Sequence, residues 1–254
     1  LFGKNATAGL LNMTTKKPVL NQRSLDGDIE YDVRDTTPGD SHGVIARTAV
    51  NLPVGNTSAL RVALAYEFQN PVTRVVAFAP GSDFDRRAFD AKVKYLFQPT
   101  DNFSLYAIAN YAKLTGGAGL WDRTYRTLAP GSANIAPLAA DGFIAGPNLL
   151  EYKADGVNYR RLENYGGQLN GAYTTDSGLK FTDVIAYRGY NLDQTSDLDF
   201  TSSNADSKSA GTSRYHQFSN EFRVALPDTN PLSGQFGLYY MNFKDQETAQ
   251  NAGN

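Results

Sequence analysis

The strongest constraint on the fold is an alternation of apolar and polar residues, with a period of two, that persists over long stretches. The clearest stretch is LRVALAYEFQ, residues 60–69, in which every even position is large and apolar and every odd position is polar or small. A strand sends successive side chains to opposite faces, whereas a helix would mix the two sets. This stretch therefore predicts a strand with one apolar face and one polar face.

The same alternation recurs along the chain and predicts an all-β protein of about nine strands with no helix. The predicted strands are residues 28–34, 44–52, 60–69, 87–98, 103–114, 161–174, 179–192, 215–226 and 235–245. The best-patterned of them run for about 10 to 12 residues, whereas strands of soluble proteins cluster near five or six. Such lengths are typical of strands that cross a membrane.

The connections between the predicted strands alternate strictly between short and long. The short set is residues 53–58, 99–102, 175–178 and 227–233, and the long set is residues 35–42, 70–85, 115–160 and 193–213. A compact soluble domain does not need a loop of about 46 residues, whereas outer-membrane barrels have short turns at one end and long loops at the other. The pattern favours an antiparallel transmembrane β-barrel. A soluble β-sandwich is the alternative.

Aromatic residues lie at both ends of the predicted strands, as expected where a barrel meets the two layers of lipid head groups. The set beside short turns is Tyr95, Phe97, Phe103 and Phe181, and the set beside long loops is Tyr66, Phe68, Tyr111 and Tyr187.

Composition excludes several functions. The net charge is −2 and the Lys and Arg residues are scattered, so we expect no nucleic-acid partner. Cysteine is absent and the two histidines are far apart, which removes thiol chemistry and the usual zinc motifs. No nucleophile with a base partner, no acid pair and no metal cluster emerges. We therefore expect no enzyme activity, no catalytic residues, no cofactor and no resident metal.

The first 18 residues, LFGKNATAGLLNMTTKKP, carry a specific motif. This segment resembles the end of the plug domain in TonB-dependent outer-membrane receptors. The resemblance lies in Phe2-Gly3, in Asn5-Ala6 followed by Gly9, and in the short strand of residues 11–15 before Lys16-Lys17-Pro18. The family usually has Ile where this chain has Leu11 and Met13. The residues that carry this plug motif are Phe2, Gly3, Asn5, Gly9, Asn12 and Thr15. A second stretch, QFSNEFRVALP at residues 217–227, resembles a recurrent strand early in these barrels.

The resemblance implies the end of a plug domain at residues 1–20 and the first part of a barrel at residues 21–254, about nine of roughly 22 strands. It implies a receptor in the outer membrane of a Gram-negative bacterium that is embedded in outer-membrane lipid. This receptor would bind a scarce nutrient, most often a ferric siderophore, and import it with energy from TonB, ExbB and ExbD. Two alternatives remain open: a passive porin-type channel, and a soluble all-β carbohydrate-active protein.

In this arrangement the short turns are periplasmic and the long loops extracellular, since the plug enters from the periplasm. The polar strand faces then point into the lumen, where we expect contacts with the plug from Arg61, Glu67, Lys92, Lys94, Glu221 and Arg223. In the long loop, aromatic and Arg residues are candidates for ligand contact, because these types dominate binding hot spots. The candidates are Trp121, Arg123, Tyr125, Arg126, Tyr152 and Tyr159. The alternative is that these loop aromatics only pack on each other.

Overall fold

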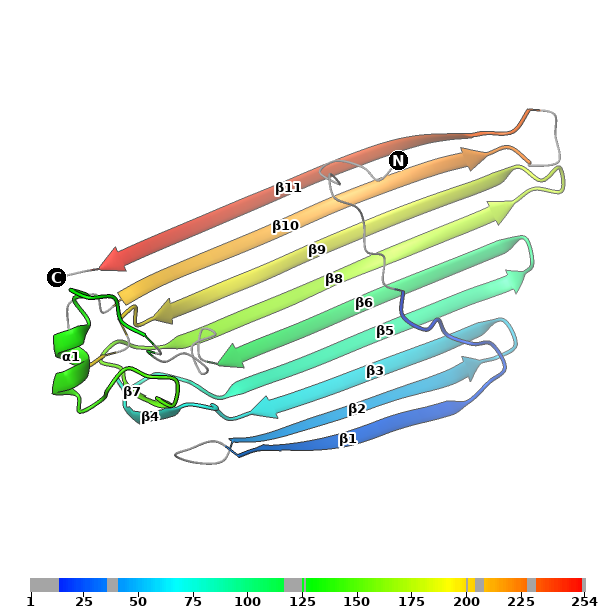
Figure 1. The fold of residues 1–254 in the computed structure, drawn as a ribbon. Helices are drawn as coiled ribbons and strands as arrows, with labels where there is room; N and C mark the ends of the chain where they lie inside the picture. The colour runs from blue at the N-terminus through cyan, green and yellow to red at the C-terminus, as the bar shows by residue number, and fades with distance from the viewer. Residues whose placement is uncertain are drawn as a thin grey trace.

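A computed structural model describes residues 14–35, 41–116, 125, 127–199, 201–203, 208–227 and 232–252, and most of these residues are in strands. Nine strands form one antiparallel sheet (Figure 1). They are β1 (Ser24–Arg34), β2 (Ser41–Val54), β3 (Ser58–Gln69), β5 (Arg86–Thr100), β6 (Phe103–Gly116), β8 (Tyr159–Thr174), β9 (Lys180–Ser196), β10 (Lys208–Ala225) and β11 (Gln235–Ala252). A sheet of consecutive up-and-down strands matches part of a β-barrel, as predicted.

Each of these nine strands pairs with the next of the nine along the chain, so the sheet is a continuous meander in the order β1-β2-β3-β5-β6-β8-β9-β10-β11. The tight turns gather at one end of the sheet and the longer connections at the other (Figure 1). The β2–β3 turn shows why it can be so short: Gly55 has a φ of 67°, a left-handed conformation that glycine adopts without steric cost. The predicted asymmetry between the two ends is confirmed.

All nine predicted strands are present, but most are longer than predicted at the end away from the tight turns. β9 continues to Ser196 and β10 begins at Lys208, so much of the predicted loop at 193–213 is strand. The extensions are polar on both faces, so they carry no alternation of hydrophobicity for a sequence reading to detect. Pairing along the ladder holds them in the sheet.

The sequence predicts only a connecting loop at residues 115–160 and no helix anywhere, and here the prediction is wrong. It contains the short helix α1 (Ile135–Ala140) and strand β7 (Glu151–Lys153), and β7 pairs in parallel with β4 (Arg74–Ala77). Both strands are too short to show a period. Phe84, Tyr152 and Ala154 form a small buried core beside this second sheet. No helix of the described residues is long and apolar enough to cross a membrane.

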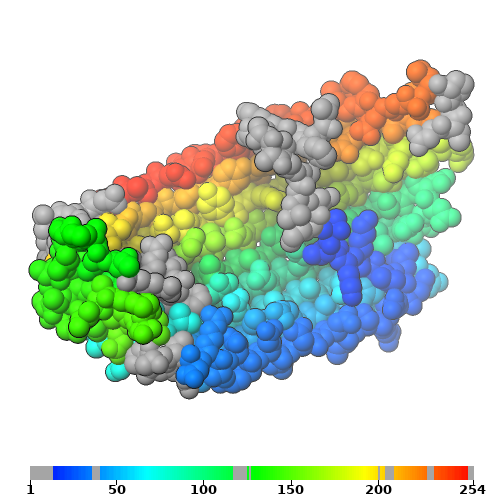
Figure 2. Space-filling model, in the orientation of Figure 1, coloured from blue at the N-terminus to red at the C-terminus, as the bar shows by residue number. Residues whose placement is uncertain are grey.

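The two faces of the large sheet differ in polarity. One face, which we call the outer face, exposes large apolar side chains on every strand, namely Ile29, Leu52, Leu64, Val93, Tyr111, Leu169, Ile185, Phe222 and Leu238. The opposite, inner face carries most of the charged residues of the strands. Residues 14–23 run across this inner face without regular secondary structure, with a turn at Leu20 and Asn21, before β1 begins (Figures 1 and 2).

Candidate functional site

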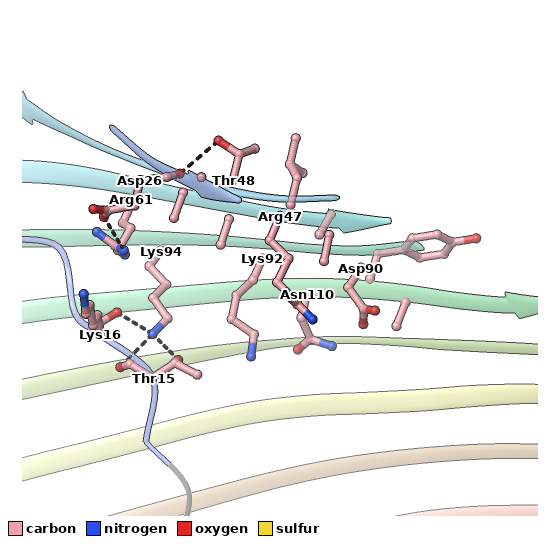
Figure 3. Close-up of a pocket in the computed structure, with 18 of the residues that line it drawn as sticks. Thr15, Lys16, Asp26, Arg47, Thr48, Arg61, Asp90, Lys92, Lys94 and Asn110 are labelled. Atoms are coloured by element: carbon pink, nitrogen blue, oxygen red, sulfur yellow. Dashed lines mark hydrogen bonds and ion pairs between the residues drawn. The ribbon is translucent and has the colours of Figure 1, made fainter. Parts of the chain in front are cut away.

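The inner face holds residues 14–23 through a buried lysine on β5. Lys94 is only 4% exposed, and its ammonium group donates hydrogen bonds to the backbone oxygens of Thr15 (3.0 Å) and Lys16 (2.8 Å) and to the Thr15 hydroxyl. An ammonium group has three donors, and here each has an acceptor in the segment (Figure 3). Lys94 and Thr15, both named from the sequence, are therefore brought into direct contact.

Two further side chains of the sheet hold the same segment. Asn51 of β2 is 1% exposed; its amide accepts from the backbone N–H of Val19 (2.9 Å) and donates to the carbonyls of Val19 (2.9 Å) and Gln22 (2.6 Å). The ammonium group of Lys17 lies 5.5 Å from the ring centre of Tyr106 on β6, a cation–π contact. Three strands thus fix the segment on the inner face. We call Lys94, Asn51 and Tyr106 the clamp.

A cavity of about 460 Å³ opens beside the clamp on the inner face (Figure 3). It is lined by charged groups of both signs, including Asp26, Arg47, Arg61, Asp90 and Lys92. Arg61 pairs with Asp26 across strands at 3.6 Å, and Arg47 pairs with Asp28 at 2.6 Å. The wall of this cavity therefore combines charged groups with apolar surface.

The other predicted inner-face residues contact the sheet itself in the described part of the chain. Glu67 pairs with Arg86 on β5 at 3.1 Å, and Glu221 pairs with Arg223 two residues along β10 at 2.6 Å. Lys92 lines the cavity without a recorded ion pair. Their predicted contacts with a plug stay predictions, because Phe2, Gly3, Asn5, Gly9 and Asn12 lie outside the described residues.

The residues of the long loop that the sequence suggested as ligand contacts differ in their burial and in their partners. Tyr152 is 1% exposed and packs edge-on against Phe84, with ring centres 6.2 Å apart. Tyr125 donates a hydrogen bond to the backbone oxygen of Asp199, and burial raises the pKa of its phenol to about 12. Tyr159 begins β8 and donates to Asp193 at 3.0 Å. Trp121, Arg123 and Arg126 lie outside the described residues. Tyr152 and Tyr125 thus contribute to packing between loops.

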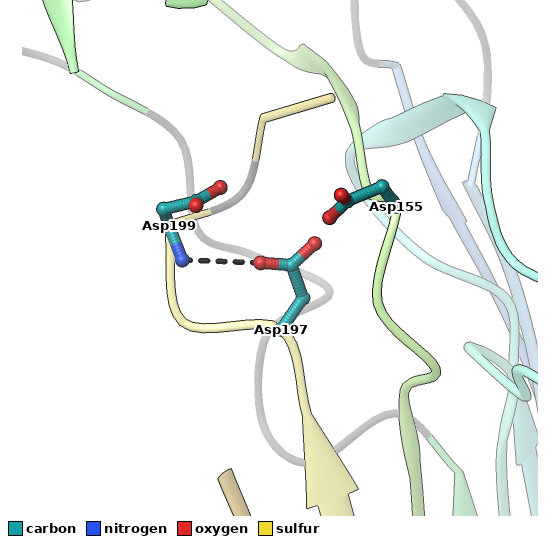
Figure 4. A group of neighbouring side chains, drawn as sticks. All are labelled: Asp155, Asp197 and Asp199. Carbon is teal, nitrogen blue, oxygen red and sulfur yellow. Dashed lines mark hydrogen bonds between the residues drawn. The ribbon is translucent and has the colours of Figure 1, made fainter. Parts of the chain in front are cut away.

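The carboxylates of Asp155, Asp197 and Asp199 have oxygen atoms within 4.8 Å of one another (Figure 4). They lie at the end of the sheet that carries the long connections. Asp197 accepts from the backbone N–H groups of Gly156 (3.2 Å) and Asp199 (3.0 Å). Burial, followed by the charge of Asp199, raises the pKa of Asp155. Among the described residues this is the group best suited to bind a cation, but its local hydrogen bonds already account for two of the three carboxylates.

Sequence reasoning missed Asn51, Tyr106 and the acidic group. In the sequence, Asn51 is one polar position on an alternating strand, and nothing distinguishes it from Asn110 or Asn170. The partners of these residues are distant in the chain: Asn51 binds residues about 30 positions away. Only the fold brings them together.

Comparison with known proteins supports the fold. The structure is similar to the ferric yersiniabactin uptake receptor FyuA from Yersinia pestis, with a TM-score of 0.67 and 18% sequence identity over 96% of this chain. The match covers 34% of FyuA, so the chain spans about a third of the length of that protein. No protein-family model and no curated protein matches the sequence.

Proposed function

We propose that the chain is part of an active-transport receptor of the Gram-negative outer membrane, which binds a scarce nutrient and imports it with energy from TonB. The observation that carries this proposal is the outer face: large apolar side chains are exposed on all nine strands of the sheet. Soluble proteins rarely expose an apolar surface of this extent, whereas a barrel presents such a band to lipid.

The clamp supports a receptor over an open channel. Residues 14–23 lie across the inner face, where a lumen would be, and the sheet buries a lysine to hold them there. We propose that these residues end a plug domain, as the resemblance of residues 1–18 implies. A passive channel has no need of a segment fixed across its interior.

A ferric siderophore is the nutrient that we propose. Two arguments support this class: the resemblance of the sequence to TonB-dependent receptors, and the fold that the chain shares with a receptor named for ferric yersiniabactin uptake. ExbB and ExbD follow as partners of TonB. We propose no enzyme activity and no resident cofactor.

Uptake by whole cells tests this function. Cells that carry or lack the intact gene are grown under iron limitation and given radioactive iron bound to a panel of siderophores. We expect deletion to abolish uptake of one siderophore class, and a protonophore to abolish it equally in wild-type cells. Uptake that survives the protonophore would identify a passive channel. Recovery of the full-length protein in the aqueous fraction without detergent would contradict a membrane location.

A further inference from the structure

The cavity beside the clamp owes its volume to small side chains on the inner face. In one tier of the sheet, Ala49 of β2 is opposite Ala63 of β3, and Ala63 is opposite Lys92 of β5. Ala65, two residues further along β3, leaves the same space in the next tier. An alanine side chain ends at one carbon, whereas the charged side chains around it extend further from the sheet. About 460 Å³ is therefore left open, within the range of roughly 300–1,000 Å³ that is usual for small-molecule sites.

Cations outnumber carboxylates around this cavity. Its charged lining consists of Lys16, Arg47, Arg61, Lys92 and Lys94 on one side of the balance and Asp26, Asp28 and Asp90 on the other. Asp28 already pairs with Arg47 at 2.6 Å, and Asp26 already pairs with Arg61 at 3.6 Å. Two of the carboxylates are thus engaged by two of the cations, and the remaining charges leave an excess of positive charge.

The buried ammonium group of Lys94 contributes to this excess. Its three hydrogen bonds go to uncharged oxygen atoms of residues 15 and 16, so they place no carboxylate beside it. The charged side chains that act on it are those of Lys92, Arg61 and Lys17, and all three are cations. Water screens charges poorly in a partly buried space, so the cavity beside Lys94 has a positive potential.

Two side chains that line the cavity have hydrogen-bond donors to spare. Lys92 is half-buried and has no ion pair or hydrogen bond within the described part of the chain; the same holds for Asn110, which is opposite it on β6. Both side chains extend to the same side of the sheet as Arg47 (Figure 3). Asp90, two residues from Lys92, also has no recorded partner there, and it is exposed. The cavity thus offers donors to an anion, and one carboxylate that opposes it.

We propose that this cavity binds a small polycarboxylate anion. Lys92 and Asn110 donate hydrogen bonds to its carboxylate oxygens, which are strong when the donor is charged. The alanines of the floor contact the carbon atoms between the carboxylates. A phosphate ion would leave most of the volume and this apolar floor unused. The inference rests on the proposed function, since we take the polycarboxylate to be the chelating part of the imported nutrient.

Calorimetric titration of the full-length protein in detergent, at constant ionic strength, tests the inference. The titrants are sodium citrate, its uncharged triethyl ester, sodium phosphate and ferric citrate. We expect citrate to bind, the ester not to bind, and phosphate to bind about tenfold more weakly than citrate. Ferric citrate should displace citrate, because both present carboxylates to the same donors.

Two substitutions in the lining should change the citrate affinity in opposite directions. Lys92→Gln removes a charged donor and should weaken binding about tenfold, whereas Lys92→Arg should retain most of the affinity. Asp90→Asn removes the opposing carboxylate and should strengthen binding about threefold. A folding defect would not produce this gain.

Arg188→Gln is the matched control. Arg188 is a cation on the inner face of β9, opposite Gln217, and lies outside the cavity. Removing its charge should leave citrate binding unaltered. A loss equal to that of Lys92→Gln would overturn the inference, because it would assign the effect to the overall charge of the inner face.

Three further results would overturn the inference: no binding of citrate, binding of the ester as tight as that of citrate, or a citrate affinity that Lys92→Gln leaves unchanged. Ferric citrate that fails to displace citrate would overturn the link to the nutrient. A receptor that imports its nutrient but binds no citrate refutes only the cavity site. Uptake that survives the protonophore refutes the proposed function and has no bearing on the titrations.

Discussion

Lys94 illustrates how a single residue fixes the relation between two parts of this chain. A buried ammonium group is unfavourable unless its donors are satisfied. Here Thr15 and Lys16 supply the acceptors, and both lie almost 80 residues earlier in the sequence. The residue and the segment therefore depend on each other: the segment has a fixed place because Lys94 needs acceptors there.

Replacing Lys94 by methionine should release the segment. The change removes hydrogen bonds from a charged donor, which contribute about 2 kcal/mol, so the released state should become roughly thirtyfold more populated. The sequence has no cysteine, so a single cysteine introduced at Pro18, which is buried in the structure, reports release through its rate of reaction with a thiol reagent.

Lys92→Met is the control, since Lys92 lies two residues away on the same face and makes no recorded contact with the segment. We expect slow labelling in this variant, as in the parent protein. Equal labelling rates in the two variants would show that Lys94 does not hold the segment.

Asp155 is the second residue whose environment leads to a prediction. Its Oδ1 atom is buried and has no hydrogen-bond partner among the described residues. Burial raises the pKa of this carboxyl, so the folded loops bind its proton more tightly than the unfolded chain does. The stabilisation by the protonated form is therefore present at low pH and lost as the pH rises from about 3.9 through the raised pKa.

Replacing Asp155 by asparagine should remove this pH dependence and make the loop packing tighter at neutral pH. The measurement is hydrogen exchange of residues 151–158, corrected for intrinsic rates, at about pH 5 and about pH 7.5. Protection in the parent protein should fall as the pH rises, and protection in the variant should stay level. Greater protection of the parent at neutral pH than at acid pH would contradict the assigned cause.

At the scale of elements, β3 shows how closely the sequence pattern follows the structure. Its even residues lie on the outer face and its odd residues on the inner face, where Arg61 reaches Asp26. The alternation predicted both faces correctly because a strand has no other way to arrange successive side chains. α1, β4 and β7 could not be predicted in this way. They are short, and contacts between loops that are distant in sequence stabilise them, as Tyr152 and Phe84 show.

Opposite faces of β3 should respond differently to a new charge. Leu64→Lys places an ammonium group on the outer face and should destabilise the protein by about 2–4 kcal/mol if that face meets lipid near the bilayer centre. Ala65→Lys is the matched change on the inner face and should cost much less. Urea unfolding of the full-length protein in lipid vesicles measures both. A similar loss for the two variants would argue against a lipid-facing outer face.

At the scale of the whole molecule, the sheet has two open edges. β1 and β11 each pair with a single neighbour, so each presents unpaired backbone groups along 11 and 18 residues respectively. Open edges together with an exposed apolar face favour association.

The chain of 254 residues, expressed alone in water, should therefore aggregate. Sedimentation and size-exclusion chromatography after expression without detergent measure this, with the full-length protein in detergent as the reference. We expect the chain in the insoluble fraction. A soluble, monodisperse monomer would contradict both the open sheet and the membrane-facing role of its outer face.

The sequence by itself determined the class of the fold, the number of long strands, which residues share a face and which end of the sheet carries the long connections. These properties are local, since the alternation and the turn residues depend on neighbours only a few positions away. The tertiary structure decided the rest: that Lys94 and Asn51 hold residues 14–23, that loops pack around Tyr152, and that Arg47 and Asn110 border one cavity. The reason is physical, because these contacts join residues distant in the chain, and strand register, which no local pattern encodes, sets which of them meet.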